Sequence, residues 1–145
     1  MKPDDARLRL YVNVLAGVDD ETLLLMIRNA LEKNCFINGR KNFVNISLSA
    51  RLLAKGMDRG ENVVGLFKKV AAELDEERSS KAIERSIRSA LHGAWSRACK
   101  HGRFAETTLL CRYDKCPRSK DFLWDLAAEV LEKIRPIEGQ CLPPQ

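Results

Sequence analysis

Apolar residues recur at three- and four-residue intervals along most of the chain, which is the spacing of one face of an α-helix. Polar or glycine-containing segments separate these stretches, and we expect Gly56 to end the second of them. The pattern predicts helices over residues 23–33, 47–55, 63–74, 81–97 and 120–135. The expected fold is therefore an all-α multi-helix bundle.

Residues suited to begin a helix stand ahead of three of these segments. Asp19 and Asp20 give the first helix an acidic start, which favours the positive end of its dipole. Ser79 or Ser80 can cap the fourth helix, and Ser119 the last, by accepting a hydrogen bond from a free backbone N–H. Residues 101–120 read as a loop, or as a short helix plus a loop.

The N-terminal segment has a different period. Residues 7–15 alternate between polar and apolar side chains, which favours a short strand, with a helix as the alternative. A lone strand has unpaired N–H and C=O groups and would be able to pair across a dimer. We divide the chain into an extension at 1–21, a domain at 22–135 and a flexible tail at 136–145.

Composition narrows the class of protein. The chain has 145 residues, of which 45% are hydrophobic and 31% charged, as expected for one globular domain. Its longest apolar run, Leu23 to Ile27, is too short to cross a bilayer, and the first residues do not form the apolar core of a signal peptide. We expect a cytoplasmic protein with no membrane partner.

The cysteines suggest neither a disulfide framework nor a metal site. They are odd in number, irregularly spaced and without a CxxC pair: Cys35, Cys99, Cys111, Cys116 and Cys141. Cys111 and Cys116 with His92 and His101 fit no common zinc spacing, so we predict no metal and no cofactor.

An enzyme is the second class to weigh. His101 with Cys99 or Cys111 would supply a base and a thiol nucleophile. Neither cysteine stands in a recognisable nucleophile setting, and the chain has two histidines in all. We therefore predict no catalytic residues and no enzymatic activity.

Positive charge is concentrated in one segment. From Glu77 to Arg103 there are seven basic residues against two acidic ones, so this segment carries the +5 net charge of the whole chain. A helical wheel places the apolar residues of this helix together: Ile83, Ile87, Ala90, Leu91, Ala94 and Trp95. The opposite face is cationic and rich in hydrogen-bond donors, with Glu84 at its boundary: Lys81, Arg85, Arg88, Ser89, His92 and Ser96.

Such a helix suits the major groove of double-stranded DNA. There an Arg can bond guanine O6 and N7, and a Glu can accept from cytosine N4. We predict base reading by Glu84, Arg85 and Arg88, with residues 63–74 as the first helix of a helix-turn-helix. The predicted phosphate contacts are Lys68, Lys81, Ser89, Arg97, Lys100 and Arg103. The alternative is a helical module whose solvated basic face packs on an acidic protein partner.

Three segments of the chain also resemble a known family. Residues 83–97, IERSIRSALHGAWSR, resemble the recognition helix in the C-terminal effector domain of the sporulation initiation response regulators of Firmicutes. Residues 66–71 are similar to the first helix of that family's motif, and residues 117–123 to the start of its last helix. The resemblance is good over residues 46–134 and weak before them.

The resemblance implies an all-α domain whose recognition helix enters the major groove and reads a short box upstream of promoters. Glu84, Arg85 and Arg88 fall on the family's base-reading positions, and Lys81, Ser89 and Arg97 near its phosphate contacts. It also implies a homodimer on DNA and RNA polymerase as a further partner, although no specific polymerase contact carries over.

The chain departs from the family in four respects. The residues ahead of the match are too few for a phospho-acceptor receiver domain, so we expect no aspartyl-phosphate switch within this chain. The turn at 75–80 is longer, and the loop at 100–116 differs in character. Ser89 and Ala82 replace larger polar or basic residues, which should remove DNA contacts. The alternative within this family is an interaction module that antagonises or partners a full-length regulator without reading DNA.

Overall fold

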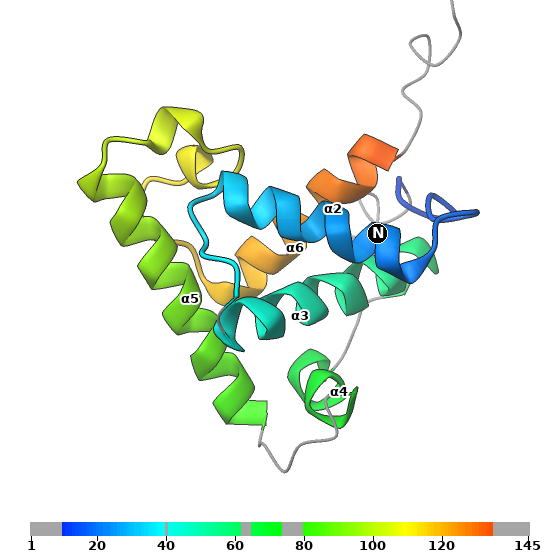
Figure 1. The fold of residues 1–145 in the computed structure, drawn as a ribbon. Helices are drawn as coiled ribbons and strands as arrows, with labels where there is room; N and C mark the ends of the chain where they lie inside the picture. The colour runs from blue at the N-terminus through cyan, green and yellow to red at the C-terminus, as the bar shows by residue number, and fades with distance from the viewer. Residues whose placement is uncertain (1–9, 40, 62–64, 74–79, 135–145) are drawn as a thin grey trace, which may run out of the picture.

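The computed structural model describes residues 10–39, 41–61, 65–73 and 80–134, and within them every regular element is a helix (Figure 1). The α-helices are α2 (Asp20–Lys33), α3 (Lys41–Asp58), α4 (Leu66–Glu73), α5 (Ser80–Lys100) and α6 (Ser119–Ile134). Two short 3-10 helices, η1 (Phe104–Glu106) and η2 (Leu110–Arg112), lie between α5 and α6. The predicted all-α bundle is confirmed.

Helices α2, α5 and α6 begin close to the signals predicted for them. The Asp19 carboxylate accepts a hydrogen bond from the Thr22 N–H at 2.7 Å, and this bond holds the pKa of Asp19 below its ordinary value. Helix α6 begins at Ser119, within a residue of the predicted start. Helix α5 begins at Ser80, and Ser79 lies outside the described residues.

The predicted bounds of α3 are wrong at both ends. The helix runs from Lys41 to Asp58, and Gly56 is buried inside it instead of ending it. The stop is Gly60, whose φ of 73° places it in the left-handed region. Its N–H donates to the Met57 carbonyl and the Glu61 N–H to the Gly56 carbonyl, which is the Schellman pattern.

The predicted strand at 7–15 is also wrong where it can be seen. Residues 10–17 form turns, and residues 7–9 lie outside the described part of the chain. The Leu15 N–H donates to the Asp58 carboxylate at 2.8 Å, and the Asn13 N–H donates to the Asp58 carbonyl at 2.9 Å. Tyr11 is buried, with its hydroxyl donating to Glu132 at 2.9 Å. The end of α3 therefore satisfies backbone groups that a strand would have paired with another strand.

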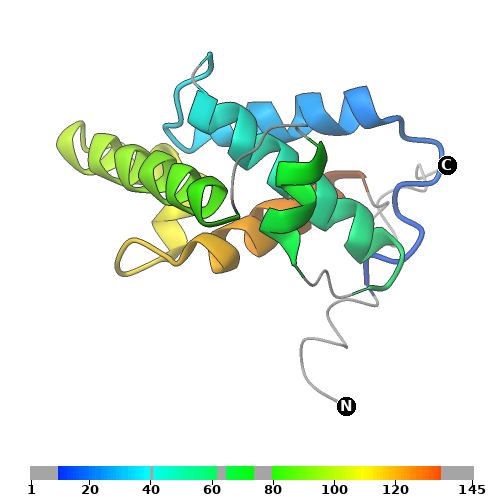
Figure 2. The ribbon, with the colours of Figure 1, turned by 90° about the horizontal axis from the view of Figure 1, so that it is seen from below.

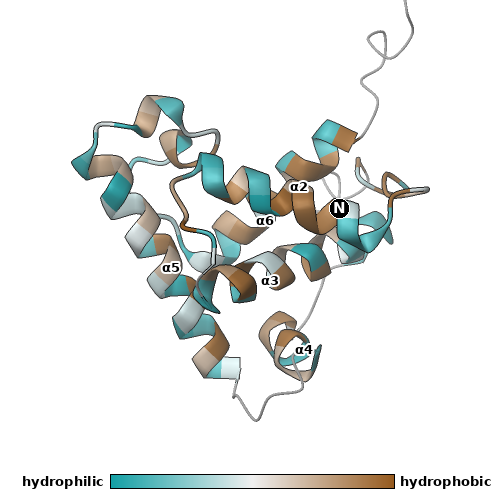
Figure 3. Ribbon diagram, in the orientation of Figure 1, coloured by the Kyte–Doolittle hydropathy of each residue, from teal (hydrophilic) through white to brown (hydrophobic). Residues whose placement is uncertain are grey.

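Helix α3 lies at the centre of the fold and contacts α2, α4, α5 and α6 (Figures 1 and 2). Its apolar residues face the core, and the ring of Phe36, just before it, stacks on Phe122 of α6 at 5.4 Å between centroids. Helix α5 forms one edge of the molecule, where brown and teal residues alternate along it in Figure 3. None of the helices in the described ranges combines the length and the apolar character needed to cross a membrane.

Candidate nucleic-acid interface

Helix α5 has 21 residues and is therefore about 30 Å long. Its buried residues follow one another at spacings of three or four, which aligns them in a single stripe: Ile83, Ile87, Leu91, Ala94 and Ala98. This stripe packs against α3, α4 and α6. One side of α5 is thus fixed in the core, and the other side faces solvent along the whole helix.

The solvent-facing side is cationic over its first half. Lys81, Arg85 and Arg88 are all exposed, and Glu84 is half-buried at the edge of the same face. Seven residues separate Lys81 from Arg88, or about 10 Å along the helix axis, which corresponds to about three base-pair steps. The structure therefore brings together the three residues predicted to read bases and Lys81, a predicted phosphate contact.

These cations repel one another within the helix. Lys81 and Arg85 are four residues apart, and Arg85 and Arg88 are three apart, so each pair of like charges is adjacent on the surface. The ion pairs between described residues lie elsewhere: Arg51–Glu73, Lys55–Asp20, Arg59–Glu61 and Arg103–Glu106. Among the described residues, Lys81, Arg85 and Arg88 form no ion pair, and Glu84 at the edge of the face is one acid against these three cations. A bound polyanion would therefore relieve the repulsion.

Ser86 contributes, together with the buried stripe, to how α5 is rotated about its own axis. It is half-buried between Arg85 and Arg88, and its hydroxyl donates to the Asn42 side-chain oxygen. The Asn45 side-chain amide donates to the same hydroxyl at 2.8 Å. The two asparagines belong to α3, so these bonds turn Ser86 inward and leave its arginine neighbours outward. The predicted helix at 47–55 begins after both asparagines, so its sequence pattern gave no sign of these bonds.

Arg97 lies in a different setting from the exposed arginines. It is half-buried, and its Nε donates to the Cys35 carbonyl at 2.8 Å. Its guanidinium also lies over Gly93, where a Cβ would stand 3.2 Å from Nη1. Cys35 has a φ of 67° in the turn between α2 and α3, which aims its carbonyl at α5. Arg97 thus fastens the second half of α5 to that turn.

The remaining predicted phosphate contacts are spread more widely. Ser89 and Lys100 are exposed on α5, and Lys68 is exposed on α4. Arg103 follows α5 and bonds Glu106 at 2.7 Å through its Nε, a contact that raises the pKa of Arg103. The structure therefore places Lys81 and Ser89 beside the residues predicted to read bases, and Arg97 and Arg103 in contacts of their own.

A buried asparagine attaches the loop after α5 to the bundle. Asn34 has no exposed surface, and its side-chain oxygen accepts from the N–H groups of Leu109 and Leu110 at 2.9 and 3.1 Å. Its amide donates to the Ala30 carbonyl at 2.8 Å and to the Thr108 hydroxyl at 3.0 Å. All four hydrogen-bonding positions of the side chain are thus used. The sequence carries no local signal for this role, because three of the four partners are more than 70 positions away.

Within the described residues, the cysteines and histidines are not grouped as ligands of a metal ion. Cys99 and Cys111 are exposed thiols, and the Cys111 thiol donates to the Thr107 carbonyl. Burial raises the pKa of Cys116, which disfavours its thiolate. Across the described ranges, no three His, Cys, Asp or Glu side chains are grouped closely enough to hold a metal ion. Cys141 lies outside the described residues.

Comparisons with known proteins return no relative. No family model matches the chain, and neither a curated protein nor a solved structure matches it. Any function assigned to this chain therefore rests on its own residues and on their arrangement in the fold.

Proposed function

We propose that this protein binds double-stranded DNA in a sequence-specific way and regulates transcription, with α5 in the major groove. The observation that carries the proposal is the set of exposed cations Lys81, Arg85 and Arg88 on one face of a 21-residue helix. They have no acidic partner among the described residues, and α5 rests on the bundle through its opposite face. An α-helix presented in this way fits the major groove.

In this proposal, α4 and α5 act as a helix-turn-helix. Helix α4 packs against both α3 and α5, so it supports the helix that enters the groove. Arg85 and Arg88 each bond guanine O6 and N7, and Glu84 accepts from cytosine N4. Phosphates are held by exposed donors around this face: Lys68, Lys81, Ser89, Lys100 and Arg103.

The resemblance of residues 83–97 to the recognition helix of sporulation initiation regulators supports the same function. Under this proposal the protein works in the cytoplasm, binds its site as a homodimer, and has RNA polymerase as a further partner.

The test is fluorescence anisotropy with two labelled duplexes, one carrying the family's short box and one scrambled, across a salt series. We expect preferential binding to the duplex that carries the box, and we expect Arg85→Ala to lose about 1–3 kcal/mol of that binding free energy. Arg59→Ala is the matched control, because Arg59 is also exposed but lies just beyond the end of α3. It should leave the preference unchanged.

Equal, strongly salt-dependent binding to both duplexes would indicate DNA binding with another target, to be found by selection from random duplexes. Absence of binding at low salt would contradict the proposal. The cationic face of α5 would then be assigned to an acidic protein partner, as expected for a module that antagonises or partners a full-length regulator.

A further inference from the structure

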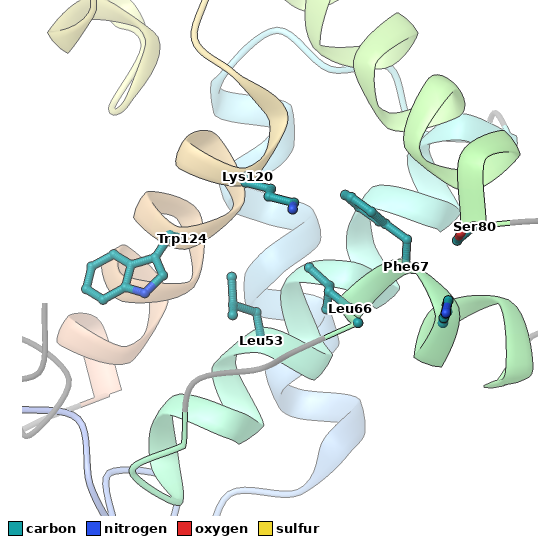
Figure 4. Close-up of a pocket in the computed structure, with 8 residues that line it drawn as sticks. Leu53, Leu66, Phe67, Ser80, Lys120 and Trp124 are labelled. Carbon is teal, nitrogen blue, oxygen red and sulfur yellow. The ribbon is translucent and has the colours of Figure 1, made fainter.

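A cavity of about 350 Å³ opens where α3, α4, α5 and α6 meet (Figure 4). It lies beside the start of α5, and the proposed base-reading residues Glu84, Arg85 and Arg88 are not among those that line it. The described residues that line it come from all four helices and the bend before α4: Leu53, Gly65, Leu66, Phe67, Lys68, Ser80, Lys120 and Trp124.

The lining combines apolar walls with positive charge. Leu53, Leu66 and Phe67 supply aliphatic and aromatic surface from α3 and α4, and Trp124 lines the cavity from α6. The Lys120 side chain extends from α6 toward Phe67 (Figure 4). None of the described lining residues is acidic. A molecule with an apolar body and an anionic head would match both parts of this lining.

The size of the cavity limits the body of such a molecule. A cavity of roughly 150 Å³ with apolar walls holds benzene, and small-molecule sites begin at roughly 300 Å³. A cavity of about 350 Å³ therefore accommodates a medium-length acyl chain, and it is too small for a folded protein segment.

We propose that this cavity binds a small amphipathic carboxylate, with the carboxylate at the Lys120 ammonium and the chain against Leu66 and Phe67. A charge-assisted hydrogen bond holds the head, and burial of apolar surface holds the chain. The occupant contacts α4 and α6 together. Because it binds the folded chain, it raises the thermal stability of the protein by mass action.

The probe is sodium octanoate, with octan-1-ol as the uncharged analogue of the same length. Trp95→Phe is the reporter variant, because the chain has two tryptophans and this change leaves Trp124 alone. Trp95 packs on Phe104, away from the cavity lining. We expect octanoate to give a saturable change in Trp124 emission and a rise in melting temperature, with octan-1-ol binding about tenfold more weakly.

Lys120→Met in the reporter background removes the charge and keeps most of the aliphatic stem. We expect it to weaken octanoate binding about tenfold and to leave octan-1-ol binding unchanged. Lys133→Met, exposed in the last turn of the same helix, is the matched control and should bind octanoate normally. Melting curves without ligand verify that both variants are folded.

Two results would overturn the proposal. The first is no saturable change in Trp124 emission up to about 10 mM octanoate, because a dissociation constant above that concentration is too weak for a specific small-molecule site. The second is equal octanoate affinity in Lys120→Met and Lys133→Met. The measurements use the protein without DNA. Failure of DNA binding and failure of this site are therefore separate outcomes.

Discussion

The arginines in the two halves of α5 lie in different surroundings. In the first half, Arg85 and Arg88 are exposed and have no ion-pair partner among the described residues. In the second half, Arg97 donates to the Cys35 carbonyl and lies over Gly93. The same type of residue is thus available for a ligand in the first half of the helix and engaged in an internal contact in the second half.

The anchors of the two halves explain this difference. The second half is followed by a loop that Asn34 fastens to the bundle, and Trp95 packs edge-on against Phe104 at 4.6 Å between centroids. The first half is held through the Ser86 hydroxyl and the buried stripe beneath it. Both halves are therefore held by contacts that do not involve Arg85 or Arg88, so α5 can present these cations on a rigid face.

The largest effect on the comparison should come from Asn34→Ala. This change leaves two buried backbone N–H groups, of Leu109 and Leu110, without their acceptor. We expect the free energy of unfolding in urea to fall by about 2–4 kcal/mol. Asn29→Ala, at an exposed position of α2, the helix that Asn34 follows, should change it by less than about 0.5 kcal/mol. Equal losses for the two variants would contradict the role given to Asn34.

Arg97→Met and Arg88→Met form a matched pair that tests the two halves directly. Arg97→Met removes a charged donor to the Cys35 carbonyl, so we expect a loss of about 1.5 kcal/mol in the free energy of unfolding. Arg88→Met should change stability by less than about 0.5 kcal/mol and should weaken DNA binding instead. If Arg97→Met weakened DNA binding as much as Arg88→Met at equal stability, Arg97 would be the phosphate contact that the sequence predicts.

The smallest effect should come from Ser86→Ala. The Asn45 amide loses its hydroxyl acceptor and Asn42 loses a donor, and Asn45 is almost fully buried. We expect a loss of about 1 kcal/mol, measured by urea denaturation. Ser96→Ala on the exposed face is the control and should be neutral. No loss in Ser86→Ala would mean that the apolar stripe alone sets the rotation of α5.

Local patterns predicted the helices well where the period was clear. The apolar stripes of α5 and α6 lie where the sequence places them, because a three- and four-residue spacing has one physical interpretation over a long segment. The extent of α3 was missed, since both Gly56 and Gly60 resemble stop signals and only Gly60 takes a positive φ. The buried Ser47 and Ser49 in that helix bond to carbonyls four residues earlier, which makes polar residues compatible with the core.

The sequence by itself determined the helical class of this protein and the cationic face of α5, because both follow from periodicity within one element. Only the tertiary structure decided which cations stay exposed, since Arg97 donates to a carbonyl 62 positions away. It also decided how the N-terminal segment is held, since Tyr11 donates to Glu132 across the fold. The cavity beside α4 was likewise decided by packing, because its walls come from four helices that no local pattern brings together.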